Sequence, residues 1–305
     1  MLMPGATAVD RGQTNAPRAP TVLRVLLGAQ LRKLRESRGV SASAAAQAIR
    51  ASESKISRIE LGRHGVREVD VADLLDLYGV TDGAVREQFL STAAQASQLG
   101  WWHHYQDVIP SWFTCYLGLE ESADLIRSFD AQFVPGLLQT QEYSRAVLQL
   151  GAHAPDDVPR LVRLRQQRQE QRAASRHLWT AIDETALHRP VGSPEVMRGQ
   201  LEHLLDVAGR PGVTIQVTPF RTGAYYAAPA SFSILHFASE DLPDVVYVEQ
   251  LTSALYLDKR ADVYRYAQAM DQISATSTQP EESVALIRTA LTRLPGSQTA
   301  QRAAG

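Results

Sequence analysis

ASESKISRIELGR, residues 51–63, sets two isoleucines three positions apart among serines and charged residues. Because a helix turns by about 100° per residue, Ile56 and Ile59 fall on one face, which can enter a hydrophobic core. The opposite direction points along Ser54, Arg58 and Leu61. The stretch therefore predicts a short amphipathic helix with one apolar face and an outward face that is mostly polar.

The sequence on either side predicts a small helical bundle around this segment. Leu27, Leu31 and Leu34 form one stripe over residues 26–38, and Gly39 can end that helix in the left-handed conformation. A second helix is expected over Ala44–Ile49, capped by Ser41 or Ser43. A third is capped by Ser52, runs to Glu60 and is closed by Gly62, and a fourth lies at about 67–78. Two short helices joined by about three residues make a helix-turn-helix.

The distribution of charge separates this bundle from the rest of the chain. The 305 residues carry a net charge of −2, but residues 24–67 hold ten Lys/Arg against three Asp/Glu, and the remainder is acidic. A basic segment on an acidic remainder favours a polyanion as partner of the first part only. The alternative is a helical bundle whose basic face is merely solvated.

The spacing also predicts which residues would contact double-stranded DNA. In a helix-turn-helix the second helix enters the major groove with its N-terminal residues first, so Glu53, Ser54 and Arg58 are candidates for base edges. Arg58 can bind O6 and N7 of guanine, and Glu53 can accept from a cytosine amino group. The candidates for contacts with the DNA backbone are Arg32, Lys33, Arg35, Arg50, Ser52, Lys55, Ser57 and Arg63.

LRKLRESRGVSASAAAQAIRASESKISRIELGR, residues 31–63, resembles without a gap the helix-turn-helix of the phage repressor and Cro type, the XRE family. The resemblance implies that Ser52, Glu53, Ser54 and Arg58 cap the recognition helix and touch bases.

Two positions depart from the family pattern. Ala42 stands where relatives often carry a glutamine that touches the DNA backbone, so that contact is expected to be lost. Arg50 stands where a glycine often makes the turn, so either its backbone must tolerate a less favourable geometry or the turn must differ slightly.

The larger C-terminal region predicts an α+β domain with a small antiparallel or mixed sheet, so the chain is expected to be multi-domain, with an all-α head first. Residues 160–176 predict a basic helix with a solvated or partner-facing side, and a second DNA contact is the less favoured alternative. The expected strands are HLWTAIDE, VTIQVTPF, SFSILHFA and DVVYVEQL, and the expected helices lie at about 194–208, 258–274 and 280–293.

This region looks like the C-terminal domain of unknown function that follows a repressor-type head in actinobacterial, WhiJ-like regulators. The stretches that carry the likeness are VPGLLQTQEYSRAVL, RPVGSPEVMRGQLEHLL, VTIQVTPF and DVVYVEQLTSALYLD. The resemblance implies a transcription factor, often a repressor, that works with a small partner protein encoded nearby. A dimer is expected because one head offers few base contacts. An antitoxin-like protein-recognition module with secondary DNA binding is the alternative.

The expected domain boundaries follow from these patterns. Residues 1–22 and 294–305 are predicted as disordered tails, 23–80 as the helix-turn-helix domain, 81–109 as a helical linker, and 110–293 as the regulatory or partner-binding domain. Within the linker, Val85, Phe89 and Ala93 are expected on one side of a helix.

The sequence predicts no catalytic residue, metal or cofactor. Cys115 is the single cysteine and is predicted to be an inert core thiol, which with the absence of an apolar span favours the cytoplasm. Glu184 and His188 are interpreted as a surface hydrogen bond in preference to a metal site. The loop PFRTGAYYAAPASF, residues 219–232, is either a packed structural loop or a ligand or partner surface carrying Phe220, Arg221, Tyr225 and Tyr226.

Overall fold

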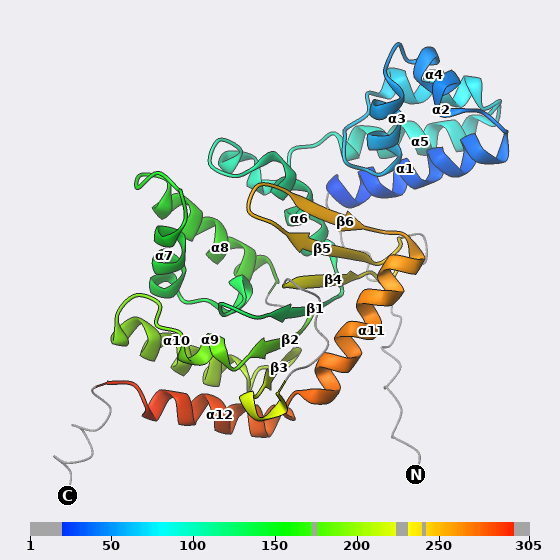
Figure 1. Ribbon diagram of the computed structural model, residues 1–305. Coiled ribbons are helices and arrows are strands. Elements are labelled where there is room, and N and C mark those ends of the chain that lie inside the picture. The colour runs from blue at the N-terminus through cyan, green and yellow to red at the C-terminus, as the bar shows by residue number, and fades with distance from the viewer. Residues whose placement is uncertain (1–19, 173–175, 224–230, 240–241, 296–305) are drawn as a thin grey trace, which may run out of the picture.

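The computed structural model describes residues 20–172, 176–223, 231–239 and 242–295. It has an N-terminal helical head followed by an α+β domain built on a six-stranded mixed sheet, as the sequence predicts. Figure 1 shows the head beyond the β6 side of the sheet.

The head is a five-helix bundle with its own hydrophobic core. Its helices are α1 (Pro20–Ser37), α2 (Ala42–Ala48), α3 (Glu53–Glu60), α4 (Glu68–Leu77) and α5 (Gly83–Ala96). The predicted caps are present: the side chain of Ser41 accepts from the amide of Ala44, and that of Ser52 accepts from the amide of Lys55. Ile56 and Ile59 belong to the core cluster of this bundle.

The fifth helix differs from the helical linker predicted for residues 81–109. Phe89 and Ala93 are buried in the same cluster as Leu27 and Leu31 of α1, so α5 is part of the head. Val85, expected on the same side, is instead 36% exposed. The chain leaves the head only after α5 and continues through a short 3₁₀ segment, η1 (Trp101–Tyr105).

Helix α1 belongs to both parts of the molecule. It begins at Pro20, two residues before the predicted end of the N-terminal tail, and Val22 and Leu26 are buried in the core of the α+β domain. The next residue, Leu27, and Leu31 one turn after it are buried in the core of the head. A Cβ atom added to Gly118 of α6 would lie 2.3 Å from the hydroxyl of Thr21, so the two helices touch. The head is therefore joined to the body by a continuous helix.

The sheet has the order β3-β2-β1-β4-β5-β6. Its strands are β1 (Leu125–Asp130), β2 (His177–Asp183), β3 (Val213–Thr218), β4 (Phe232–His236), β5 (Val245–Glu249) and β6 (Ala254–Leu257). The β1, β2 and β3 strands are mutually parallel, and the β1–β4, β4–β5 and β5–β6 pairs are antiparallel. The strands β1 and β6 are not predicted from the sequence.

Helices cover both faces of this sheet (Figure 1). On one face, Phe129, Phe232 and Val246 pack against α11 (Arg260–Thr276). The larger core on the other face involves α6 (Ser111–Ser122), α10 (Pro194–Val207) and α12 (Pro280–Thr292). The remaining elements are η2 (Gly136–Leu138), α7 (Gln141–Leu150), α8 (Val158–Arg172), α9 (Thr185–His188) and η3 (Phe220–Thr222).

The basic helix α8 is solvated only in part, because Arg163 and Glu170 are exposed whereas two other arginines enter the core, and this corrects the interpretation of residues 160–176 in part. Arg168 donates to both carboxylate oxygens of the buried Glu120 at 2.8 and 2.7 Å. Arg172 is 7% exposed and donates to the backbone oxygens of Glu120, Ala123 and His177. A guanidinium can enter a core when its N–H groups find such acceptors, so the polar pattern alone does not reveal this burial.

In the described ranges, no helix is long and apolar enough to cross a bilayer. The same ranges contain no group of three or more His, Cys, Asp or Glu side chains arranged to hold a metal ion.

Candidate nucleic-acid interface

The third helix of the head presents the polar face predicted from its sequence. Ile56 and Ile59 are 1% and 2% exposed, whereas Glu53, Ser54 and Arg58 are all exposed. The Arg58 Nε atom donates to the backbone oxygen of Ser54 at 3.3 Å, one turn earlier on the same helix. The guanidinium keeps further N–H groups, which is what a bidentate contact with a base edge requires.

The turn between α2 and α3 contains a strained residue. Arg50 has a φ of 53°, the only positive φ at a residue other than glycine in the described part of the chain. A side chain in this left-handed region costs about 1–2 kcal/mol. The turn is held by a hydrogen bond from the amide of Ala51 to the oxygen of Ala46 at 2.8 Å. The less favourable geometry expected at Arg50 is therefore confirmed.

Most of the predicted backbone contacts lie on the surface of the head. Arg32, Lys33, Arg50, Ser52 and Ser57 are exposed. Arg32 forms an ion pair with Glu36 at 2.8 Å along α1, with both side chains about half exposed, so it can exchange this partner for a phosphate at little cost.

Lys55 has a structural contact as well as an outward position. Its Nζ atom lies 3.8 Å from a carboxylate oxygen of Asp70, a side chain that is 3% exposed. Arg67 donates to the two oxygens of the same carboxylate at 3.1 and 2.6 Å. Asp70 of α4 therefore anchors the first turn of α3 through Lys55.

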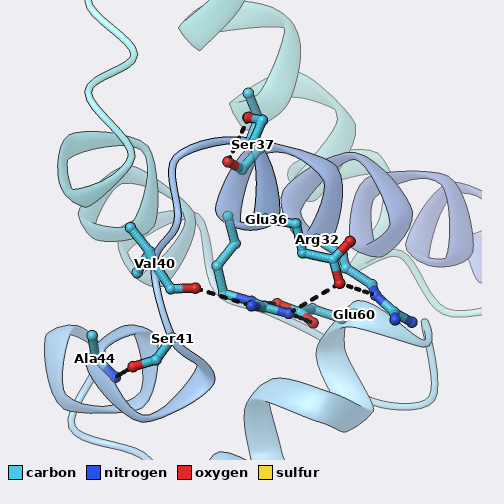
Figure 2. Close-up of polar contacts among 9 residues, drawn as sticks. Arg32, Glu36, Ser37, Val40, Ser41, Ala44 and Glu60 are labelled. Carbon is cyan, nitrogen blue, oxygen red and sulfur yellow. Dashed lines mark hydrogen bonds and ion pairs between the residues drawn. The ribbon is translucent and has the colours of Figure 1, made fainter.

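Arg35 does not face outward, which corrects its prediction as a contact with the DNA backbone. It donates through Nε and Nη2 to the carboxylate of Glu60 at 2.6 and 2.9 Å, and through Nη1 to the oxygen of Val40 at 3.0 Å. The hydrogen bond with Glu60 raises the pKa of Arg35, so the guanidinium stays charged. Figure 2 shows Glu60 of α3 facing α1 beside Glu36 and the loop that carries Val40. Arg35 therefore positions the last turn of α3.

Arg63, two residues after α3 and its C-cap, is held by the other domain. Its Nη2 atom donates to the backbone oxygen of Tyr256 in β6 at 2.9 Å, and its guanidinium carbon lies 5.9 Å from the centre of the Tyr256 ring. The side chain remains exposed. The sequence predicts Arg63 as a phosphate contact, and nothing in its pattern indicates the contact with β6, because the partner is 193 positions away.

The second candidate surface, at the end of β3, is only partly within the described residues. Phe220 is 59% exposed and its ring stacks on His188 with centroids 5.8 Å apart. Arg221 forms an exposed ion pair with Glu282 at 3.7 Å. The predicted Tyr225 and Tyr226 lie outside the described residues. Glu184 binds both the His188 ring, at 3.3 Å, and the amide of Phe220, at 2.7 Å, which agrees with a hydrogen-bonded pair.

Cys115 is located on α6, packed against the core of the body. Burial raises the pKa of its thiol to about 11. The thiol therefore stays protonated near neutral pH, as expected for the inert cysteine that the sequence predicts.

Two family models match the chain, and together they define its class. A model described as a helix-turn-helix domain matches residues 26–89. A model described as a domain of unknown function (DUF5753) matches residues 113–289. The fold and the exposed face of α3 thus define a helix-turn-helix protein with a second, α+β domain. Because the second model spans more than half of the 305 residues, the chain belongs to the family that carries this domain of unknown function.

One solved structure shares detectable sequence with the chain. The crystal structure of the clp gene regulator ClgR from C. glutamicum is 32% identical, and the match covers 26% of this chain and 96% of that chain. Its TM-score of 0.20 supports no argument about the fold. A comparison with curated proteins gave no match.

Proposed function

We propose that this protein is a sequence-specific DNA-binding transcriptional regulator that reads the major groove with α3. The observation that carries the proposal is the division of this helix into a buried isoleucine face and an exposed face with Glu53, Ser54 and Arg58. The match to a helix-turn-helix model and the sequence likeness to a gene regulator support it.

The exposed groups are suited to the two kinds of contact that such a protein makes. Arg58 and Glu53 are proposed to bind base edges, guanine and cytosine respectively, with Ser54 as an adaptable hydrogen-bonding group. Lys33 and Arg50, with Arg32, Ser52, Lys55 and Ser57, are proposed to bind phosphates, which contribute affinity independent of sequence.

We assign the regulatory role to the α+β domain, which is proposed to dimerise, to sense a ligand or small partner protein, or both. The resemblance to XRE-type heads and to actinobacterial WhiJ-like regulators supports a repressor-like action. A dimer places two recognition helices one helical turn apart and doubles the number of base contacts.

Selection of bound sites from random DNA by the full chain tests this function. Two inverted half-sites about one helical turn apart are expected. Arg58→Ala should weaken the selected site by about 1–3 kcal/mol and relax preference at one base pair, while Lys33→Ala weakens all sequences equally. Enrichment of no sequence, or an unchanged base preference in the Arg58 variant, would overturn the assignment of α3.

A second candidate function is an antitoxin-like protein-recognition module in which DNA binding is secondary. The exposed aromatic ring of Phe220 beside the exposed Arg221 favours it, because such pairs are common at protein interfaces. It predicts that one small protein co-purifies in a fixed ratio and that Phe220→Ser abolishes the association without changing the selected DNA site. Phe220→Ser that leaves the association intact would count against this surface.

A further inference from the structure

The α+β domain contains a cavity of about 590 Å³, within the size range of sites for small organic molecules. Its floor is the sheet, with side chains from β1, β4 and β5, and its walls come from α6, α7 and α8. Much of the wall is apolar and includes Ile109, Phe113, Phe133, Val147 and Leu161. This cavity lies in the body and is separate from the DNA-facing surface of α3.

Two carboxylates that form no close ion pair within the described residues line this cavity. In the part of the chain that the structure describes, Asp130 at the end of β1 has the Ser128 hydroxyl as its side-chain partner, and Glu249 at the end of β5 accepts from the Tyr247 hydroxyl at 3.1 Å. Both residues line the cavity. Burial, with the nearby Glu249 adding to it, raises the pKa of Asp130 to about 7, as expected where a cation is lacking.

The arginines that line the cavity do not balance these two carboxylates. Arg168 is already bound by Glu120, and this pair is neutral. Arg165 and Arg168 both interact electrostatically with Glu249 without a close ion pair. The Nη1 atom of Arg165 donates to Gln139 and Ser144. With both carboxylates ionised, the cavity therefore has one negative charge in excess.

A single positive charge would bring these groups to neutrality, and the aromatic wall suits such a ligand. Phe133 and Tyr247 contribute aromatic side chains to the cavity lining, and aromatic rings attract organic cations. Arg165 has further N–H groups that can donate to a carbonyl or hydroxyl oxygen of the same molecule. An inorganic cation would leave the apolar wall without a partner, so an organic body is required.

The wall of the cavity is connected through Tyr256 to Arg63, in the segment after the recognition helix. The ring of Tyr247 packs against the rings of Tyr116 and Tyr256 in tilted arrangements, at centroid distances of 4.2 and 5.2 Å. Tyr256 donates from its hydroxyl to the backbone oxygen of Trp112, another cavity residue, at 2.6 Å. Its own backbone oxygen accepts from Arg63 at 2.9 Å. A ligand that displaces Tyr247 thus acts on a residue in contact with the segment after α3.

We propose that this cavity is an effector site for an amphipathic organic amine, whose cationic group binds between Asp130 and Glu249 and whose occupancy changes DNA affinity through Tyr256 and Arg63. The cavity assignment stands on its own geometry, whereas the effect on DNA rests on the function proposed above.

The binding test uses dansylcadaverine, which carries one primary amine, and the neutral N-pentyl dansylamide of similar size. Dansyl emission in the presence of the full chain should show that the amine binds at least tenfold more tightly than the neutral probe. Asp130→Asn and Glu249→Gln should each reduce this preference at least fivefold. Glu202→Gln, at an exposed carboxylate of α10 away from the cavity, should leave it unchanged. No binding, or equal binding of the two probes, would overturn the site.

The coupling test measures affinity for the selected DNA site with and without saturating dansylcadaverine. A change of at least threefold is expected, and Arg63→Met should reduce that ratio while leaving probe binding intact. Equal DNA affinity with and without the probe would overturn the effector role. If the chain binds no DNA at all but retains the amine preference, the proposed function fails and the binding site stands.

Discussion

The ion pair between Arg35 and Glu60 gives the sharpest test of how the head supports its recognition helix. The two side chains are 13% and 8% exposed, and two hydrogen bonds at 2.6 and 2.9 Å join them. Breaking a fully buried pair costs about 3–5 kcal/mol, whereas an exposed pair contributes about 0–1 kcal/mol. This nearly buried, bidentate pair lies between these limits, so Glu60→Gln should lower the free energy of unfolding of the head by about 2 kcal/mol.

A double-mutant cycle separates the pair from the side chains themselves. Arg35→Met and Glu60→Gln should each destabilise the head, and the double variant should be about 1–2 kcal/mol more stable than the sum of the single effects predicts. Urea unfolding followed by far-ultraviolet circular dichroism reports on all helices. Tryptophan emission reports on the rest of the molecule, because residues 20–100 contain no tryptophan. The loss of stability in the head should therefore shift the unfolding transition followed by circular dichroism and leave the transition followed by tryptophan emission unchanged.

The same variants decide between a positioning role and a phosphate contact. At a temperature where all variants are folded, Lys33→Met should reduce the slope of log K against log salt by about 0.9, as expected for one lost phosphate contact. Arg35→Met should leave that slope unchanged. If Arg35→Met lowers the slope as Lys33→Met does and leaves stability intact, then the assignment of Arg35 as an internal support is wrong.

Three further changes test the local geometry. Arg50→Gly removes a side chain from a left-handed position with φ of 53° and should raise the free energy of unfolding by about 1 kcal/mol. It should also lower the slope of log K against log salt for DNA binding by about 0.9. A less stable variant would contradict the strain at this position. Gly28→Ala places a Cβ atom 2.3 Å from the backbone oxygen of Ile59, so α1 and α3 must separate, and urea unfolding should show a loss of about 2 kcal/mol in the free energy of unfolding. The control Gly65→Ala, whose Cβ meets open space, should change that free energy by no more than about 0.5 kcal/mol. Equal effects of the two substitutions would refute the close approach of the helices. Asp130→Asn removes a carboxyl whose pKa burial raises to about 7, above its ordinary value near 3.9. Between these two pH values the carboxyl ionises in the unfolded chain but stays protonated in the folded protein, so the wild type loses stability as pH rises through this window. With Glu249 and Arg165 unchanged, the variant should gain about 2 kcal/mol relative to the wild type between pH 5 and 8, and a constant difference would refute the burial.

The sequence by itself determined most of the head. The spacing of Ile56 and Ile59, the caps Ser41 and Ser52, and the glycines that end the helices depend on interactions within a few residues. Such local rules apply wherever the segment lies. The strained turn at Arg50 was expected only from the family resemblance, which places a glycine at this position, because a side chain there meets its own backbone when φ is positive.

The sheet of the body was determined only in part by its sequence. Four strands follow from runs of Val, Ile and aromatic residues. The central strand β1, with Arg127, Ser128 and Asp130 in LIRSFD, does not show such a pattern. Its polar groups are tolerated because partners from other strands and helices satisfy them, as when Ser128 bonds to Thr180 of β2 at 2.8 Å. Those partners are distant in the chain, so no local pattern reveals them.

Only the tertiary structure decided which cations face outward. Arg32, Lys33, Arg35 and Arg63 are equivalent in sequence as basic residues near a recognition helix, yet Arg35 binds Glu60 and Arg63 binds Tyr256. The burial of Arg168 and Arg172 in α8 and the cavity beside them were likewise beyond the sequence. A long charged side chain takes whichever acceptor the fold brings within its reach, and that depends on contacts made dozens or hundreds of residues away.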